Sequence, residues 1–282
     1  MKFGESVHIV PLGFEFDRAA KLFKKHKPDK VYLLITPQDP KYPPEMNKDQ
    51  EHFNKINADE LKANDIHFEF VDADIFDMLK TADSVSKLII KEIEGDNRKR
   101  KNIYVNMSAA GKKTSIGATL AARAQGAQVY YVFADGYSQG REEYLQHGIS
   151  ICDNPTMDPL PNFQIQKLDL GLLQVLGFLS RTTIATSDEI ITFLKGQGYT
   201  KFDDASKVIE NIRLPSLPNN ERRSKMDEVR GIKQRNSNRL NKSFLNKLKE
   251  DDYIDRRIEG RNSNIWITES GKFALALHGM LY

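Results

Sequence analysis

Short apolar runs alternate with amphipathic stretches along the first half of the chain. Strands are predicted at 6–11, 30–36, 67–71, 102–108, 128–134 and 147–152. Helices are predicted between them, at 17–25, 47–64, 75–94 and 113–125. The run at 30–36 is almost continuously apolar, as expected for a parallel strand buried on both faces. Strands that alternate with helices form βαβ units, so the first half is expected to be a Rossmann-like α/β domain with a parallel sheet.

The pattern changes after a proline-rich segment. Residues 153–163 contain three of the chain's 11 prolines and show no apolar periodicity. Such a segment is typical of a linker, which we expect at 153–165. It would separate an N-terminal domain at 1–152 from a second domain at 166–282.

The second domain begins with helices and ends with a hairpin. Helices are predicted at 168–180, 186–199, 203–214 and 221–234, the second of them starting at the cap-like Ser187. Residues 237–254 are predicted to form a helix that runs into a strand, and residues 255–268 a hairpin. A further helix is predicted after the hairpin. These are the parts of an α+β winged helix-turn-helix domain.

Composition agrees with two folded domains. The 282 residues suit two domains of ~100–200 residues each. Hydrophobic residues make up 39% of the chain and charged residues 29%, which excludes a wholly disordered protein. No apolar run reaches the roughly 20 residues of a membrane span, and the first residues lack the apolar core of a signal peptide. A cytoplasmic protein without membrane contact is therefore expected.

Charge distinguishes the two halves of the chain. Residues 1–160 carry 22 Lys and Arg against 24 Asp and Glu, whereas residues 161–282 carry 20 against 15. The basic second half is the better candidate for binding a polyanion such as DNA. The single cysteine, Cys152, excludes an internal disulfide and disfavours a cysteine-based zinc site.

The sharpest candidate chemistry lies where the predicted strand at 102–108 turns into a helix. The candidate ligand contacts here are Asn106, Ser108, Ala109, Ala110, Gly111, Lys112, Lys113 and Thr114. Small residues let backbone N–H groups approach a ligand, and a helix N-terminus favours an anion. Two lysines at this end oppose the helix dipole unless an anion lies nearby. The alternative is an ordinary turn whose lysines are solvated.

The loop after the first strand should reach the same edge of the sheet, where ligands of open α/β sheets bind. Gly13 permits a tight turn, Phe14 could stack on a base, and Glu15 could bond a ribose or cap a helix. Alternatively, these side chains serve in packing. The chain has neither a Walker A spacing nor G-x-G-x-x-G, which disfavours NTP hydrolysis and dinucleotide redox chemistry.

These motifs, followed by a winged helix, resemble the CARF family, the CRISPR-associated Rossmann-fold regulators of transcription-factor type. The resemblance rests on Gly13 and Phe14 in the first loop and on the run from Asn106 to Lys113 in the second. It implies a symmetric homodimer with one pocket across the two-fold axis. The implied ligand is a cyclic oligoadenylate, typically the tetramer. The resemblance also leaves room for slow cleavage of this ring, as in some members of the family.

The predicted recognition helix has an apolar and a polar face. The apolar positions, at helical spacing, are Leu240, Phe244, Leu245 and Leu248. The candidate DNA contacts are Asn238, Arg239, Asn241 and Lys242 on the polar face, with Arg256, Arg257 and Arg261 in the hairpin. Arg can read guanine, Asn can read adenine, and Lys binds mainly phosphate. The alternative is a winged helix that binds another protein, its basic face solvated.

Other chemistries find little support. Arg141 and His147 fit the loose spacing of HEPN ribonucleases, but within an α/β domain we interpret this as a chance match. Asp72, Asp74 and Asp77 follow a strand and are expected to cap the next helix rather than to hold Mg²⁺. The histidines show no metal-binding spacing, and no G-x-S-x-G elbow is present. No catalytic residue, metal or cofactor is therefore predicted.

The sequence favours a ligand-responsive transcriptional regulator. A nucleotide second messenger, expected to be a cyclic oligoadenylate, would bind at the dimer axis and change the spacing of two winged helices on palindromic double-stranded DNA. Two alternatives stay open. The protein could be a ring nuclease that destroys the messenger, or a nucleotide-sensing module whose winged helix binds another protein.

Overall fold

The computed structural model describes residues 5–95, 101–161, 165, 167–212, 218–259 and 262–281. The chain divides into two compact units. The N-terminal unit comprises residues 1–167 together with 276–281, and the C-terminal unit comprises residues 168–275.

The N-terminal unit is built on a six-stranded sheet with the strand order β3-β2-β1-β4-β5-β8. Its strands are β1 (Glu5–Pro11), β2 (Lys30–Ile35), β3 (His67–Asp72), β4 (Lys101–Asn106), β5 (Gln128–Tyr131) and β8 (Asp158–Pro159). The first five of these run parallel to one another. The strand order reverses between β1 and β4. The carboxyl ends of these two strands therefore flank a topological switch point, the usual position of a ligand in such sheets.

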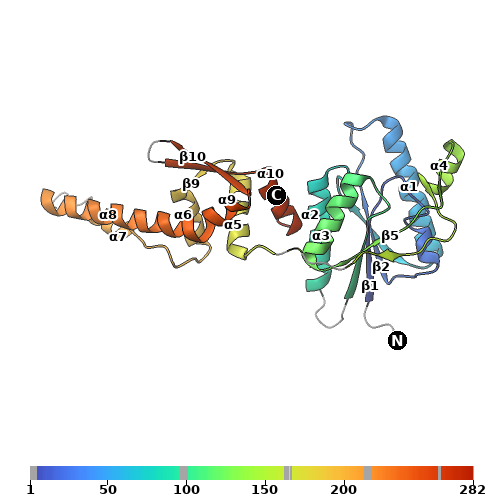
Figure 1. The fold of residues 1–282 in the computed structure, drawn as a ribbon, viewed down its shortest axis with the longest axis horizontal. Helices are drawn as coiled ribbons and strands as arrows, with labels where there is room; N and C mark the ends of the chain where they lie inside the picture. The colour runs from blue at the N-terminus through green and yellow to red at the C-terminus, as the bar shows by residue number, and fades with distance from the viewer. Residues whose placement is uncertain are drawn as a thin grey trace. The chain divides into compact units, whose positions relative to one another are not determined.

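Helices cover both faces of this sheet (Figure 1). On one face, α2 (Met78–Glu94) packs against α3 (Lys112–Gln125), and on the other α1 (Pro44–Ala63) packs beside the short 3-10 helix η1 (Lys21–Lys24). Most residues of β1 and β2 are buried, as their almost continuous apolar sequences predict. The Rossmann-like fold expected from the alternation of strands and helices is confirmed.

Two predicted helices begin later than expected. The helix predicted at 17–25 is reduced to η1, because the amides of Phe16 and Asp17 both donate to the carbonyl of His147, a distant segment that holds them in a loop. The helix predicted from Ile75 begins at Met78. Asp77 caps it, its carboxylate accepting hydrogen bonds from two amides of the first turn.

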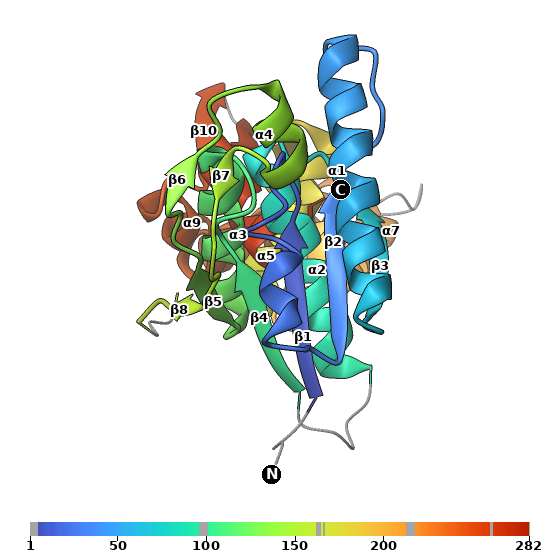
Figure 2. The same ribbon diagram turned by 90° about the vertical axis from the view of Figure 1, so that its right-hand side faces the viewer.

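A small insertion follows β5. It contains β6 (Gly136–Tyr137), α4 (Arg141–His147) and β7 (Ser150–Ile151), with β6 antiparallel to β7. The sequence predicted only a strand here, at 147–152, because α4 has no buried residue to give it an apolar period. Figure 2 shows α4 and the N-terminal end of α1 rising beyond the carboxyl ends of the central strands. They therefore border the edge at which a ligand is expected.

Two further segments complete the N-terminal unit. Asp158–Pro159, within the expected linker, forms the edge strand β8 antiparallel to β5, a position that tolerates proline because edge N–H groups need no partner strand. Residues 276–281 belong to the same unit. The carbonyl of Leu277 accepts hydrogen bonds from Ser86 Oγ at 2.9 Å and from Gln125 Nε2 at 2.6 Å. These two donors lie on α2 and at the end of α3.

The C-terminal unit combines helices with a three-stranded antiparallel sheet of order β10-β11-β9. Its helices are α5 (Leu170–Thr182), α6 (Ser187–Gly196), α7 (Ser206–Ile212), α8 (Asn219–Leu240), α9 (Asn246–Glu250) and α10 (Glu269–Leu277). Its strands are β9 (Ala185–Thr186), β10 (Ile254–Glu259) and β11 (Asn262–Ile267). The predicted winged helix-turn-helix fold is confirmed by this order of elements.

Local details of the C-terminal unit differ from the sequence prediction. The helices expected at 221–234 and at the start of 237–254 form one run, since a π-helical segment, Asn241–Leu245, joins α8 directly to α9. The cap of α6 is Thr186 and not Ser187. Thr186 and Glu189 form a capping box, in which each side chain accepts from the backbone amide of the other. No helix within the described ranges is long and apolar enough to cross a membrane.

Candidate functional site

Two loops meet at the switch point of the sheet. The amide of Gly13, just after β1, donates to the carbonyl of Ala109, just after β4, at 2.8 Å. A Cβ atom at Gly13 would lie 3.2 Å from this carbonyl and from the Cα of Ala110, so the close approach favours glycine. The structure thus brings together the two segments that the sequence selected as candidate ligand contacts.

Asn106 and Ser108 shape the second loop from inside. The Asn106 side chain donates to the carbonyl of Arg18 at 2.8 Å and accepts from the amide and the hydroxyl of Ser108 at 2.8 and 2.6 Å. The Ser108 hydroxyl also accepts from the amide of Val132 at 3.0 Å. Both side chains are buried. Their polar atoms are therefore engaged within the protein, and the loop that they hold presents its backbone to the sheet edge.

The N-terminus of α3 is the most open part of this site. Gly111 is its extended N-cap residue and provides no side-chain cap. Gly111, Lys112 and Lys113 are exposed, and no carboxylate within the described residues pairs with either lysine. Thr114 is buried instead, with its hydroxyl donating to the carbonyl of Ile75. Free backbone N–H groups, a helix dipole and two unpaired cations together can hold an anion such as phosphate.

Phe14 lies at the margin of an aromatic cluster. Its ring centroid is 6.2 Å from that of Phe53 and 6.3 Å from that of Phe76, and Phe76 in turn contacts Tyr42 at 5.0 Å. The side chain of Phe14 is only partly buried. Part of the Phe14 ring is therefore packed against the cluster, and the exposed part can contact a ligand.

Glu15 has a different environment from the one expected of a ligand contact. It is 5% exposed, and its carboxylate accepts from the amide of Ser150 at 3.1 Å and from its hydroxyl at 2.8 Å. Arg18 lies 3.7 Å away. Burial raises the pKa of Glu15 to about 7. The side chain anchors β7 to the first loop, and no part of it is open to a ligand.

A second buried carboxylate extends this anchor. Asp17 is fully buried and accepts from Lys21 Nζ at 2.9 Å and from the amide of Cys152 at 2.8 Å, with His147 Nδ1 at 3.1 Å. His147 and Cys152 lie about 130 positions from Asp17 along the chain, so no local pattern predicts that they meet. The only local signal was a charged residue beside a glycine loop.

The residues that the sequence offered for other chemistries do not come together in the structure. His147 contacts Asp17, whereas Arg141 forms a salt bridge with Asp49, so the two residues of the HEPN-like spacing do not converge. Asp74 binds Lys41 at 2.6 Å and Lys80 at 3.2 Å and does not cap α2. The described residues contain no group of three or more His, Cys, Asp or Glu that could hold a metal ion.

Large apolar side chains are exposed near the insertion. Phe133 and Tyr137 are 65% and 64% exposed, and Ile149 is 48% exposed. All three lie between the end of β5 and β7. Several such side chains within one short stretch of a folded surface typically mark a contact with another molecule.

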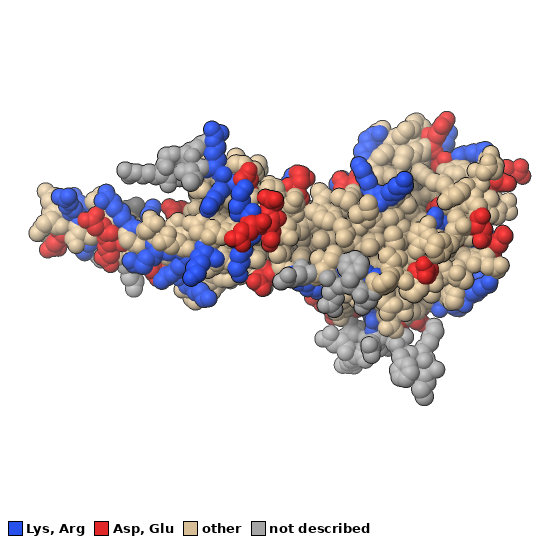
Figure 3. All heavy atoms as spheres, in the orientation of Figure 1, with Lys and Arg blue, Asp and Glu red and all other residues tan. Residues whose placement is uncertain are grey.

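The recognition helix of the C-terminal unit has the predicted apolar face. Leu240, Leu245 and Leu248 are buried, and Phe244 is partly buried against Tyr199. On the polar face Asn238 and Lys242 are exposed, and Asn238 accepts from Gln234 at 3.1 Å. Lys and Arg side chains gather along this helical run, with acidic side chains between them (Figure 3).

Arg239 points away from this polar face. Its guanidinium donates to the carbonyl of Lys201 at 2.7 Å and to Asp203 at 2.8 Å, and Arg235 binds the other oxygen of Asp203 at 3.2 Å. Residues 238 and 239 differ by about 100° around a helix, which explains why their surroundings differ. Both of these bonds come from one guanidinium nitrogen of Arg239, and they hold the side chain toward Asp203.

The hairpin divides its arginines between two faces. Arg256 donates to Asn241 at 3.1 Å and so links β10 to the recognition helix. Arg257, the next residue of the strand, projects to the opposite face. Both are exposed. Arg261 lies outside the described residues.

Two family models match this chain. Residues 172–279 match the model of the DUF6293 C-terminal winged helix domain. This match covers most of the C-terminal unit. Residues 6–137 match a second model, the HFX_2341_N-like N-terminal domain. A Rossmann-like domain followed by a DUF6293 winged helix in one chain confirms the resemblance to the CARF type with a C-terminal winged helix.

Among solved structures, the chain is similar to Csm6 of Enterococcus italicus bound to cyclic hexa-2'-fluoro-hexa-dAMP, with 11% identity and a TM-score of 0.38 over 82% of this chain. It is also similar to Can2 from Sulfobacillus thermosulfidooxidans in complex with cyclic tetra-adenylate (12%, TM-score 0.34) and to VC1899 from Vibrio cholerae (12%, TM-score 0.36), each over 98% of this chain. The matches span 56%, 64% and 65% of those three chains. Comparison with curated protein sequences finds no match.

Proposed function

We propose that this protein is a ligand-responsive, DNA-binding transcriptional regulator. The observation that carries the proposal is the contact of Gly13 with Ala109, which sets the Phe14 loop beside the exposed start of α3. An aromatic ring, free amides and two unpaired lysines at a switch point suit a ligand with both bases and phosphates. The DUF6293 winged helix on the same chain supplies a surface for DNA.

The ligand proposed is a cyclic oligoadenylate, as the CARF resemblance implies. Lys112 and Lys113 would neutralise phosphates, the amides of the loop that ends at Gly111 would donate hydrogen bonds to the phosphate oxygens, and Phe14 would stack on an adenine. Glu15, Asn106 and Ser108 would act indirectly, by holding the two loops in place. The protein would bind the ligand as a homodimer. Phe133, Tyr137 and Ile149 are exposed apolar side chains, which suit a contact with a second copy of the chain at this edge.

The DNA interface proposed is the face that carries Asn238, Asn241 and Lys242, with Arg256 at its side. The exposed amide of Asn238 and the exposed ammonium of Lys242 suit the major groove, and Arg256, which Asn241 holds beside the helix, suits the phosphates. Ligand binding would bias the distance between the two winged helices of a dimer. Such coupling requires that the ligand binds more tightly to one spacing of the two winged helices than to the other.

The testing experiment is a calorimetric titration of the purified protein with cyclic tetra-adenylate, with linear tetra-adenylate as the control. We expect saturable heat at one ring per two chains for the cyclic ligand and a weaker response to the linear one. DNA affinity is then measured with and without the ring. Absence of heat together with intact DNA binding would reject the ligand, whereas conversion of the ring to linear product would instead favour the ring nuclease alternative.

A further inference from the structure

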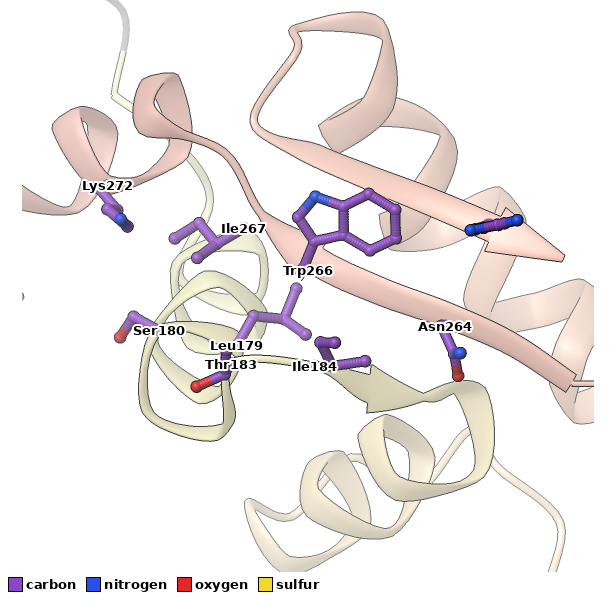
Figure 4. Close-up of a pocket in the computed structure, with 9 residues that line it drawn as sticks. Leu179, Ser180, Thr183, Ile184, Asn264, Trp266, Ile267 and Lys272 are labelled. Carbon is purple, nitrogen blue, oxygen red and sulfur yellow. The ribbon is translucent and has the colours of Figure 1, made fainter. Parts of the chain in front are cut away.

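A groove of about 540 Å³ lies on the C-terminal unit, apart from the proposed DNA-reading face. It is bounded by the end of α5, the turn before β9, the hairpin strands and the start of α10 (Figure 4). Nine residues line it: Leu179, Ser180, Thr183, Ile184, Arg257, Asn264, Trp266, Ile267 and Lys272. Neither the winged-helix family match nor the proposed regulation assigns a role to this surface.

Strand alternation explains why this groove is separate from the DNA-reading face. Ile265 of β11 is fully buried, so its neighbours Asn264 and Trp266 project to the opposite face of the sheet and into the groove. The same alternation turns Arg256 toward Asn241 of the recognition helix and Arg257 into the groove. A molecule in the groove would therefore leave the recognition helix accessible.

The floor of the groove is apolar although it faces solvent. Trp266, the only tryptophan of the chain, is only partly buried, and Ile184 is 55% exposed. Figure 4 shows Leu179 and Ile184 beneath the indole of Trp266. An indole and an isoleucine left side by side in water are typical of a surface that another molecule covers.

The backbone beneath this floor is strained in a way that exposes Ile184. Thr183 has φ +65° and ψ −54°, a region that β-branched residues avoid. The amide of Ile184 donates to the carbonyl of Thr182 at 2.7 Å, which closes a γ-turn of the rare, strained kind. This turn ends α5 and carries Ile184 to the groove. Strained turns of this kind concentrate at functional surfaces.

The charges of the groove are all positive. Arg257 is the cross-strand partner of Asn264, and Lys272 lies beyond Ile267 at the other side of Trp266 (Figure 4). None of the nine lining residues is acidic. Glu269, on the rim, binds Lys272 at 2.6 Å, but both side chains are well exposed, so an incoming carboxylate can replace this weak pair.

We infer that this groove binds an acidic, amphipathic segment of another protein. An apolar or aromatic side chain of that segment would pack on Trp266 and Ile184, and a flanking carboxylate would replace Glu269 as the partner of Lys272. A second copy of this chain fits less well, because a symmetric contact would bring the two sets of cations together. Duplex DNA would satisfy the cations but has no side chain to cover the apolar floor.

Trp266 provides a direct readout of occupancy, because no other tryptophan contributes to the emission. The probe is a synthetic peptide with a central Leu-Phe pair flanked by aspartates. Two matched peptides carry lysines in place of the aspartates, or glycines in place of the Leu-Phe pair. We expect a saturable change in Trp266 emission with the first peptide alone. Full-length protein is used throughout, and neither nucleotide ligand nor DNA is needed.

Variants then test each part of the groove. Ile184→Ser and Lys272→Glu should each weaken peptide binding about tenfold, the effect of losing one good interfacial contact. Lys247→Glu reverses an exposed charge on α9, outside the groove, and should leave peptide affinity unchanged. Affinity for DNA should remain unaltered in Ile184→Ser.

Three outcomes would overturn the inference. The first is an absent response, or an equal response to the acidic and the lysine peptide. The second is a concentration-dependent emission shift that accompanies self-association and disappears in Ile184→Ser, which would assign the groove to a second copy. The third is saturation of Trp266 emission by duplex DNA with loss of this effect in Ile184→Ser. None of these depends on whether the protein binds a nucleotide.

Discussion

The carboxylate of Glu15 accepts both hydrogen bonds that Ser150 can donate, from its amide at 3.1 Å and from its hydroxyl at 2.8 Å. Glu15 stands two residues after Gly13, so the pair fastens the insertion to the loop that borders the candidate ligand site. The carboxyl group is buried, and its pKa of about 7 exceeds the ordinary value of 4.5. This junction therefore titrates near neutrality.

The stability of the N-terminal unit should fall as pH rises through this range. Because the folded state holds the proton more tightly than the unfolded chain, the contribution of neutral Glu15 is fully present below pH 4.5 and is lost through pH 7. Urea unfolding at pH ~5 and ~8 should show a loss of about 1–3 kcal/mol in wild type that is absent in Glu15→Gln. The same pH dependence in both proteins would contradict this assignment.

Removal of both lysines at the start of α3 should weaken ligand binding. The double variant Lys112→Ala, Lys113→Ala is expected to lose about 1–3 kcal/mol of affinity for cyclic tetra-adenylate in calorimetry, because both cations would otherwise face phosphate. The matched control is Lys48→Ala, Lys55→Ala, which removes two exposed lysines of α1. DNA binding without ligand should stay intact in both. Loss of DNA binding as well would indicate misfolding.

A methyl group at Gly13 should disturb the two loops. Gly13→Ala places its Cβ 3.2 Å from the carbonyl of Ala109, so the loops must move apart by a few tenths of an ångström. We expect a loss of roughly 1 kcal/mol in stability and a larger loss of ligand affinity. Gly140→Ala is the control, since a Cβ there meets no atom within 4 Å. Thermal unfolding measures the stability of the two variants, and calorimetry measures their ligand affinity. Equal losses in both variants would contradict a special role of Gly13.

The polar face of the recognition helix should contribute unequally to DNA binding. Asn238→Ala should cost about 1–3 kcal/mol if this residue reads a base, and Lys242→Ala should reduce the salt slope of binding by about 1. Arg239→Ala should cost less, because Arg239 already pairs with Asp203 and the Lys201 carbonyl. Fluorescence anisotropy with a palindromic duplex, repeated at several salt concentrations, measures all three. A dominant effect of Arg239→Ala would show that its internal partners are exchanged for DNA.

Local sequence pattern was sufficient to predict the five parallel strands, but not the edge strand β8, which lies in the expected linker. Strand β2 is an uninterrupted apolar run, and the loop before Lys112 has the small residues that a helix N-terminus at a strand end requires. The roles of Glu15 and Arg239 could not be predicted in this way. Ser150 is 135 residues from Glu15, and Asp203 is 36 residues from Arg239, so only the folded chain shows that these pairs meet.

Gln125→Ala should lower the stability of the N-terminal unit. The variant leaves the buried carbonyl of Leu277 with Ser86 as its remaining donor, and it removes a bond of 2.6 Å. The expected loss is about 1 kcal/mol in the free energy of unfolding, measured by urea titration. Gln128→Ala, at an exposed position of β5, is the control and should change little.

The contacts of residues 276–281 also have a consequence for synthesis. A ribosome produces β8 on the order of a hundred residues before it produces the partner of Ser86 and Gln125, and N-terminal domains ordinarily fold first. In this protein the two hydrogen bonds to the carbonyl of Leu277 can form only after translation has passed through nearly the entire winged helix. The N-terminal unit is therefore completed late in synthesis, although it contains the first residues of the chain.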